Sequence, residues 1–455
     1  MPGANPTTAV SAPGKVLLAG GYLVLDRAYT GLVFGLSARI SVIAQEIHTS
    51  QGVQLTEIVV DSPQFLDAQW RYGYHLADED GGIKVTQLHV GSNLSANPFV
   101  EATLSYVLTY ISRVAHYRPS HSVKSARLTI LADNDYYSQP DSSLVDTKAV
   151  KIGSGRFAVF PTTLKGANKT GLGSSAALVT SLTASLLAHY LHPMYFDINT
   201  DKGRRTLHNL AQAAHCAAQG KVGSGFDVAA AVYGSCLYTR FSPSILSALP
   251  EPGSPGFGSK LETLVSGEAE DARWDTEVTK DGISLPAGVA MRMCDVDCGS
   301  QTVGMVKQVL AWRASDPEGS KALWDSLQKK NEALAAALRD GDLDGLPVAI
   351  GAVRELVRKM GAESGVPIEP ESQTELLDAL SKVDGVFGGV VPGAGGYDAV
   401  ALLVKDDDGT TKGVEDFLTK WTKEKGTRVR LLPVKGELEG ARMEKLNIYD
   451  GWLRK

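Results

Sequence analysis

Four short segments of this sequence hold residue types that together could bind an anion. They read SAPGK at Ser11–Lys15, KTGLGSSAA at Lys169–Ala177, GSGFD at Gly223–Asp227 and VPGAGGYD at Val391–Asp398. Their glycines let the backbone approach a ligand closely and adopt positive φ angles. Their lysines and aspartates supply opposite charges, and their serines supply hydroxyl groups. Phosphate binding is therefore the first chemistry to consider.

The segment Lys169–Ala177 carries the strongest signal. Gly171 and Gly173 precede a serine pair that opens an apolar stretch of helical length, Ser174–Leu191. The first N–H groups of a helix have no partner within it and carry partial positive charge, so they form an anion site. An ordinary glycine-to-serine start of a core helix is the alternative. The sequence contains no P-loop spacing and no strand–GxGxxG–helix unit.

The other three segments are less specific when each is taken alone. Lys15 begins an apolar strand-like run, where a solvated strand end would explain a lysine equally well. Asp227 introduces an apolar run, and a helix N-cap would explain it too. Val391–Asp398 joins two strand-like runs. A hairpin needs two residues, so the four small residues Gly393–Gly396 indicate close approach to another group.

The elements that must position these segments mix strands and helices without regular βαβ alternation. Runs rich in Val, Ile, Leu and aromatic residues predict strands at Lys15–Leu25, Leu32–Ala44, Ile58–Asp61, Ala126–Leu131, Val289–Val296, Gly385–Val391 and Ala399–Val404. Apolar residues at helical spacing predict helices at Phe99–Val114, Ser174–Leu191, Leu207–Ala218, Thr302–Ala314, Lys321–Arg339, Pro347–Met360 and Glu371–Ser381. Ser138–Gly155 is polar and turn-rich, which predicts a surface loop. The pattern predicts an α+β fold in both halves.

Length and composition limit the class of protein. At 455 residues, the chain exceeds what one hydrophobic core normally serves, so two domains are expected. The Pro-, Gly- and Ser-rich stretch Phe241–Gly282 marks the boundary, which gives domains of residues 1–245 and 246–455. The formal net charge of −6 argues against nucleic acid or a membrane surface as a partner, because such binders usually carry a basic excess.

The sequence also predicts a cytoplasmic protein. Its 4 cysteines are too sparse for a disulfide framework. The pair Cys294 and Cys298 lacks a second Cys/His pair at zinc spacing, so reduced thiols are expected. The N-terminus lacks the pattern of a signal peptide, and no run of 18 apolar residues that could span a membrane occurs.

In this order along the chain, the four segments resemble the motifs of the GHMP kinase superfamily, which includes galactokinases, homoserine kinases, mevalonate kinases and phosphomevalonate kinases. The resemblance extends from Ser11 to about Val404. It implies a two-domain α+β fold, with an N-terminal domain like ribosomal protein S5 domain 2 and a ferredoxin-like C-terminal domain. Mevalonate kinases and galactokinases tend to carry Gly-Glu-His where this chain has Gly20-Gly21-Tyr22. The details look like the fungal and plant branch that acts on 5-phosphomevalonate.

The resemblance implies ATP-dependent phosphorylation of 5-phosphomevalonate, with release of ADP, in the mevalonate pathway to isoprenoids and sterols. Lys15 and Asp227 match the catalytic pair of the family, and Ser175 would be a ligand of Mg²⁺. The loop would bind the ATP phosphates through Lys169, Gly171, Leu172, Gly173, Ser174, Ser175 and Ala176. Asn97, in an Asn-Pro-Phe turn, is a further candidate for the nucleotide pocket.

The acceptor side is less defined. The resemblance implies that Gly393 and Ala394 line the substrate or γ-phosphate side of the cleft, and Tyr22 and Ser224 are further candidate substrate contacts. The acceptor phosphate also needs basic partners, for which Lys221 and Arg240 are candidates. Ser300 is a further candidate substrate contact. Solvated surface charges would explain the two basic residues as well, and an N-cap would explain Ser300.

Two positions depart from the family pattern. His215 stands where many GHMP kinases have a glutamate that helps to hold Mg²⁺, and imidazole suits magnesium poorly. Ala167-Asn168 replaces an apolar residue followed by Pro or Lys. The second magnesium ligand is therefore unassigned, unless Asp227 takes that role.

The nature of the acceptor constrains the roles of the catalytic pair. A phosphate monoester has a second pKa of about 6 and is largely a dianion at neutral pH, so it needs no general base. It needs charge neutralisation and alignment. The hypothesis is that Lys15 bridges the donor and acceptor phosphates while Asp227 fixes Lys15 or the metal.

The alternatives are a GHMP kinase for mevalonate or a sugar, and a non-catalytic ligand sensor of the same fold. Such sensors tend to lose the reactive pair or gain insertions in the phosphate loop. This chain keeps Lys15, Asp227 and an uninterrupted GLGSSA. The sequence leaves both a monomer and a dimer open.

Overall fold

The computed structural model of the chain describes residues 5–50, 55–89, 95–115, 123–137, 155–296 and 302–453. Its strands are β1 (Thr8–Ala19), β2 (Thr30–Glu46), β3 (Glu57–Asp61), β4 (Gln69–Leu76), β5 (Ile83–Leu88), β6 (Ala126–Ala132), β7 (Cys236–Thr239), β8 (Glu277–Thr279), β9 (Val289–Val296), β10 (Val386–Val390), β11 (Ala399–Lys405), β12 (Val429–Glu437) and β13 (Arg442–Met443). Its α-helices are α1 (Pro98–Val114), α3 (Ser174–Tyr190), α4 (Asp201–Gln219), α5 (Phe226–Tyr233), α6 (Ser244–Ser247), α7 (Phe257–Ser266), α8 (Thr302–Ser315), α9 (Pro317–Asp340), α10 (Leu346–Ser364), α11 (Glu371–Leu380) and α12 (Asp408–Lys425). Short 3₁₀ turns are η1 (Leu23–Leu25), η2 (Asn134–Tyr136), η3 (Glu270–Ala272) and η4 (Leu446–Tyr449).

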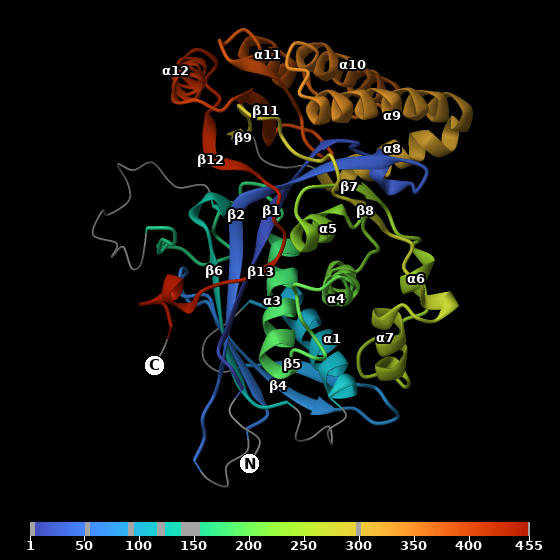
Figure 1. Cartoon of the computed structure of the whole chain (residues 1–455), viewed down its shortest axis with the longest axis vertical. Coiled ribbons are helices and arrows are strands. Elements are labelled where there is room, and N and C mark those ends of the chain that lie inside the picture. Colours follow the sequence, from blue (N-terminus) through green and yellow to red (C-terminus); the bar gives the residue numbers. More distant parts are fainter. Residues whose placement is uncertain are drawn as a thin grey trace.

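The long strand β2 organises the sheet of the N-terminal half. It pairs antiparallel with β1 along one edge, and along the other edge with β6, β12 and β7 in turn. From β6 the order continues through β3, β4 and β5. Strand β1 therefore runs beside almost the whole of β2, and both strands reach toward the C-terminal half (Figure 1). Lys15 lies in the second half of β1, where it pairs with Gly35, and Gly20 follows the strand directly.

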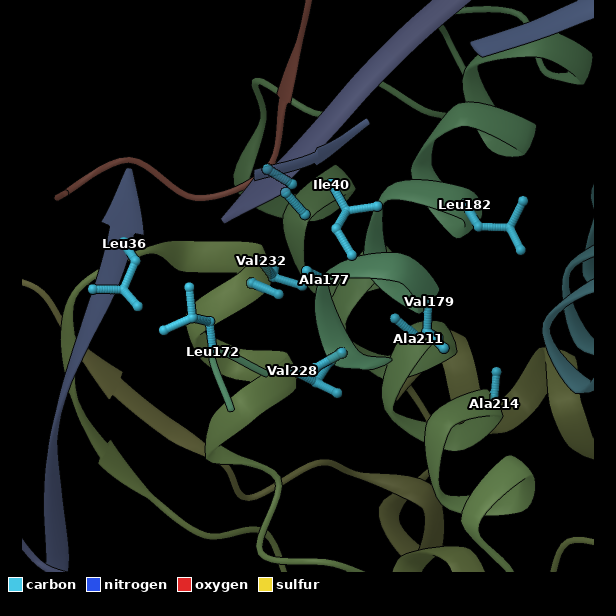
Figure 2. Packing of buried hydrophobic residues seen from close by; sticks show 14 of the residues in the cluster. Leu36, Ile40, Leu172, Ala177, Val179, Leu182, Ala211, Ala214, Val228 and Val232 are labelled. Carbon is cyan, nitrogen blue, oxygen red and sulfur yellow. The ribbon is translucent and has the colours of Figure 1, made fainter. Parts of the chain in front are cut away.

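Helices α1, α3, α4 and α5 cover one face of this sheet, with α3 packed directly on β1 and β2 (Figure 1). The small and branched residues of α3 let its neighbours approach on all sides, and Ala177, Val179 and Leu182 are fully buried. Figure 2 shows these three residues packed against Ala211 and Ala214 of α4, Val228 and Val232 of α5, and Ile40 of β2. The start of α3 is thereby fixed by core packing rather than by a side-chain cap.

The C-terminal half contains the antiparallel strands β10, β11, β9 and β12, with α10, α11 and α12 above them and α8 and α9 to their right in Figure 1. Strand β12 pairs with β9 over Val429–Lys435 and then with β2 through Gly436 and Glu437. Beyond it, β13 pairs with β1. The last strands therefore join the two halves into one continuous sheet.

The proposed domain division at residues 245 and 246 stays a prediction. The packing of the segment after it favours a later boundary, because α7 lies against α1 and α4 and β8 pairs with β7. The last segment of the chain also returns to the first half, where Trp452 and Tyr449 pack with Phe157.

Most predicted elements are present with small shifts at their ends. The strand expected at Lys15–Leu25 is wrong at both ends: it starts at Thr8 and stops at Ala19, because Gly20 (φ 93°) and Tyr22 (φ 66°) turn the chain into η1. Strands β4, β5, β7, β8, β12 and β13 and helices α5, α6, α7 and α12 were not predicted. Most of the loop predicted at Ser138–Gly155 lies outside the described residues.

Candidate active site

The phosphate-loop segment lies where the sequence placed it, at the start of α3. Gly173 is the N-cap residue with φ 81°, Gly171 has φ 72°, and no side chain caps the helix. The first N–H groups of α3 therefore remain available to an anion. The loop is tied down before the glycines, because Thr170 donates from its N–H to the Tyr136 carbonyl (3.1 Å) and from Oγ1 to the Asp135 carbonyl (2.6 Å).

Lys15 is locked against this loop. Its backbone N–H donates to the Leu172 carbonyl at 2.9 Å. Its side chain passes so close to Gly173 that a Cβ there would lie 2.8 Å from Lys15 Cε and 2.9 Å from Cγ. The two motifs, which are far apart in the sequence, thus form one structural unit, and glycine at 173 is required by space as well as by φ.

The ammonium group of Lys15 lies beside the start of α5. Nζ is 5.5 Å from the centroid of the Phe226 ring, a cation–π distance. Burial lowers the pKa of Lys15, and the negative charge of Asp227 opposes that shift. Gly225, with φ 85°, is the N-cap of α5, so Asp227 is not the cap but lies in the first helical turn. The N-cap reading of Asp227 is therefore wrong.

Ser175 and Asp227 meet around the imidazole of His215, which lies one turn before the end of α4. His215 Nε2 is 3.1 Å from Ser175 Oγ, 3.9 Å from Asp227 Oδ2 and 3.3 Å from Gln219 Nε2. The ring also lies 5.6 Å from that of Phe99, at the start of α1. His215, which stands where many GHMP kinases have a glutamate, therefore lies inside the site.

The late glycine-rich turn meets the end of β1 directly. Gly393 N–H donates to the Leu17 carbonyl at 3.0 Å, and the Tyr22 hydroxyl donates to the Ala394 carbonyl at 2.7 Å. A Cβ on Gly21 would lie 2.1 Å from the Gly393 carbonyl oxygen. Burial raises the pKa of Tyr22, so its hydroxyl keeps its proton and remains a donor.

A cavity of about 960 Å³ opens between the two halves beside these contacts. Lys15, Lys169 and Phe226 line it from the N-terminal half, and Gly393 and Ala394 line it from the C-terminal half. A volume of this size holds a ligand of nucleotide dimensions.

Two arginines of the cavity were missed by sequence reasoning. Arg428, just before β12, and Arg430, its second residue, line the cavity with Lys15 and Lys169. Arg430 Nη2 lies 3.7 Å from Asp295 Oδ2 of the paired strand β9, and its charge also acts on Asp135. The local sequence Thr427–Arg430 would look the same if these arginines were solvated residues at a strand end. Only the pairing of β12 with β9 shows that they line the cavity.

Other predicted residues lie away from the cavity lining. Arg240 Nη1 donates to the Leu25 carbonyl (2.6 Å), and its Nη2 donates to the carbonyl of Gly223 (2.8 Å). Its guanidinium therefore fastens the loop before α5 to the turn after Tyr22, a structural role that the sequence did not suggest.

The remaining predicted contacts are also described, with one exception. Asn97 is the N-cap of α1 and accepts from Val100 N–H at 3.3 Å. The Ser224 carbonyl accepts from the Tyr238 hydroxyl at 2.8 Å, and Lys221 is exposed. Ser300 lies outside the described residues.

The donor set suits a magnesium ion bound together with phosphates. In the part of the chain that the structure describes, no three His, Cys, Asp or Glu side chains gather closely enough to hold a metal by themselves. Magnesium commonly needs only one or two protein oxygens when phosphates supply others. Ser175 Oγ and Asp227 Oδ2 are such oxygens, since both lie within 3.9 Å of one atom, His215 Nε2. The residues therefore fit the ion.

Family models match both halves of the chain. The model of the GHMP kinases N-terminal domain matches residues 160–235, and that of the GHMP kinases C-terminal domain matches residues 334–412. The first range contains the phosphate loop and Asp227. The second contains α10, α11 and β10, followed by the late glycine-rich turn. The fold and the site thus define a kinase of the GHMP class.

Full-length relatives narrow the class. The phosphomevalonate kinase of Gibberella zeae is 70% identical over 449 residues, which cover 99% of each chain. The peroxisomal phosphomevalonate kinase of Arabidopsis thaliana is 34% identical, covering 88% of this chain and 90% of its own. This chain belongs to the phosphomevalonate kinase family.

Solved structures agree with this fold. Streptococcus pneumoniae phosphomevalonate kinase, in complex with phosphomevalonate and AMPPNP, has a TM-score of 0.61 at 16% identity, covering 94% of this chain and 99% of that chain. L. major mevalonate kinase in complex with R-mevalonate has a TM-score of 0.55 at 13% identity, covering 96% and 98%. Among the described residues, no helix combines the length and hydropathy that crossing a membrane would require.

Proposed function

We propose that this protein transfers the γ-phosphoryl group of ATP to the phosphate of (R)-5-phosphomevalonate, giving 5-diphosphomevalonate and ADP. The observation that carries the proposal is the union of Lys15 with the phosphate loop at the wall of a cavity of about 960 Å³. Membership of the phosphomevalonate kinase family supports the choice of acceptor.

The reaction brings two polyanions together, and the site is built to offset their repulsion. The helix start at Ser174 offers N–H groups to the donor phosphates. Lys15, Lys169, Arg428 and Arg430 line the same cavity and add positive charge from both halves. Because arginine can bind a phosphate through two parallel hydrogen bonds, the arginines are suited to fixing its orientation as well.

Each half of the catalytic pair has a defined task in this proposal. Lys15, held by Leu172 and Gly173, bridges the transferred phosphoryl group and the acceptor phosphate. Asp227 acts electrostatically on Lys15 and offers an oxygen to the metal. The acceptor phosphate is already a dianion at neutral pH, so no side chain needs to remove a proton from it. Most of the rate enhancement then comes from alignment and charge neutralisation.

Magnesium would be held by Ser175 and Asp227 together with the ATP phosphates. When bound, it would neutralise phosphate charge and help to align the donor. On the acceptor side, Gly393 and Ala394 form a wall of the cavity, and the buried Tyr22 supports this wall by donating a hydrogen bond to the Ala394 carbonyl. We place the mevalonyl part of the acceptor against this wall.

We also propose that the protein acts in the cytoplasm. The A. thaliana relative is named peroxisomal, so the location needs a direct measurement. Imaging of the full chain with a fluorescent tag in its own cells would decide between the two compartments, and punctate colocalisation with a peroxisomal marker would overturn the proposal.

Release of ADP from Mg-ATP tests the activity. Purified protein would be compared with 5-phosphomevalonate, mevalonate, galactose and homoserine as acceptors, with Lys15→Met as the matched inactive control. Turnover restricted to 5-phosphomevalonate is expected. Turnover with mevalonate would overturn the acceptor, and the absence of turnover with intact ATP binding would overturn the enzymatic reading.

A further inference from the structure

His215 lies at the point where four helices of the site converge. The residue lies one turn before the end of α4 and is only 2% exposed. Around its ring are Phe99 from the start of α1, Ser175 from the start of α3 and Asp227 from the start of α5. Its imidazole therefore lies next to the first turn of each of the other three helices.

Two polar groups meet at Nε2 of this histidine. Ser175 Oγ lies 3.1 Å from it and Gln219 Nε2 lies 3.3 Å from it. A neutral imidazole nitrogen either donates or accepts a hydrogen bond, and the tautomer decides which.

The tautomer sets the direction of the Ser175 hydroxyl. When Nε2 carries no proton, the O–H of Ser175 points at it across the 3.1 Å contact, and the oxygen lone pairs face away from the imidazole and can bind a cation. Asp227 Oδ2 lies 3.9 Å from the same nitrogen, so both candidate metal oxygens border the ring.

We propose that His215 is a positioning residue, which accepts the hydrogen of Ser175 so that the serine oxygen is presented to the divalent cation of the bound nucleotide. This proposal rests on the proposed function for the identity of the nucleotide. Imidazole itself is a poor ligand for magnesium, and its distance to Ser175 lets it act through that hydroxyl instead. Residues that orient metal ligands typically change metal affinity or activity by about 10- to 100-fold when they are replaced.

The first test is spectroscopic and needs no variant to be active. Two-bond ¹H–¹⁵N correlation spectra of the full-length wild-type protein would report the protonation of each histidine ring, with His215→Gln used to assign the signal. The expected spectrum shows a protonated Nδ1 and an unprotonated Nε2 for His215. A protonated Nε2 in the ligand-free protein would overturn the proposal.

The second test measures binding of ADP by calorimetry, with and without Mg²⁺ and with no acceptor present. For His215→Leu we expect the Mg²⁺-dependent part of ADP affinity to fall by about 10- to 100-fold, with metal-free ADP binding unchanged. His215→Gln, whose side-chain oxygen can accept from Ser175, should recover much of the loss. His208→Leu is the matched control, because His208 is equally buried (2%) in α4 and contacts Tyr233 and Trp274 instead.

A double-mutant cycle separates this role from a general structural one. If His215 acts through Ser175, then His215→Leu should have little further effect on Mg²⁺-dependent ADP binding in a Ser175→Ala background. Additive losses, or a wild-type Mg²⁺ dependence in His215→Leu, would overturn the proposal. Because no acceptor is used, a wrong assignment of 5-phosphomevalonate would leave these outcomes unaffected.

Discussion

Gly173 offers the sharpest test of how the phosphate loop and Lys15 depend on each other. Alanine at this position meets two obstacles. Its backbone has φ 81°, a left-handed conformation that costs an L-residue with a Cβ about 1–2 kcal/mol. Its Cβ would also lie 2.8 Å from Lys15 Cε, so the lysine side chain would have to move.

The size of the effect follows from these two costs. Ordinary van der Waals contact begins at 3.4 Å, so Lys15 Cε must retreat by at least about 0.6 Å. Misplacing a catalytic group by about 1 Å can cost about 100-fold in rate. The backbone cost alone corresponds to about a 10-fold loss of kcat/KM if the active conformation requires the strained φ angle. We therefore expect Gly173→Ala to lower kcat/KM by about 100-fold or more.

Gly171→Ala is the matched control, because it shares the backbone cost without the collision. Gly171 has φ 72° and nothing lies within 4 Å of a Cβ built there. Steady-state ADP release should show a loss of about 10-fold for this variant, with similar melting temperatures for both. Equal losses of kcat/KM in the two variants would refute the idea that Gly173 is required to position Lys15.

Other residues of the site and the fold give equally direct tests. Tyr22→Phe removes the hydrogen bond to the Ala394 carbonyl, which is worth about 1 kcal/mol, so KM for 5-phosphomevalonate should rise about fivefold while KM for ATP is unchanged. An equal rise in both KM values would argue against an acceptor-side role. Asp227→Asn should lower kcat but keep the wild-type shape of the pH–rate profile between about pH 5 and pH 8, because the acceptor phosphate needs no general base. Loss of one ionisation on the acidic limb of the profile would show that Asp227 acts as a base. Arg354→Met removes a main partner of the Glu369 carboxylate, whose side chain is 0% exposed, so the free energy of unfolding in urea should fall by about 3 kcal/mol. A fall below about 1 kcal/mol would contradict a stabilising role for this ion pair.

Much of the fold could be predicted because its signals are local. Strand β9 has the predicted bounds Val289–Val296, and α3 starts at the predicted Ser174. Both are apolar segments bounded by turn residues, so neighbouring positions specify them. Strand β12 was missed because buried and half-exposed residues follow no simple alternation in it and Pro433 interrupts it. Its place depends on pairing with β9 and β2, which no local pattern contains.

The sequence by itself determined the parts of the site that are properties of the backbone. Glycines at 171 and 173 require no tertiary contact to adopt positive φ, and a helix start offers free N–H groups wherever it lies. The phosphate loop, with Lys15 and Asp227 as charged candidates, was therefore recognisable in advance.

The tertiary structure alone decided which charges face the cavity. Arg240 looked like an acceptor contact but is held by backbone carbonyls, whereas Arg428 and Arg430 line the cavity and gave no signal. A side chain's surroundings depend on which distant segments its strand or loop packs against. The meeting of Ser175 and Asp227 at His215 follows from core packing among α3, α4 and α5, and long-range packing of this kind leaves no signature in the order of neighbouring residues.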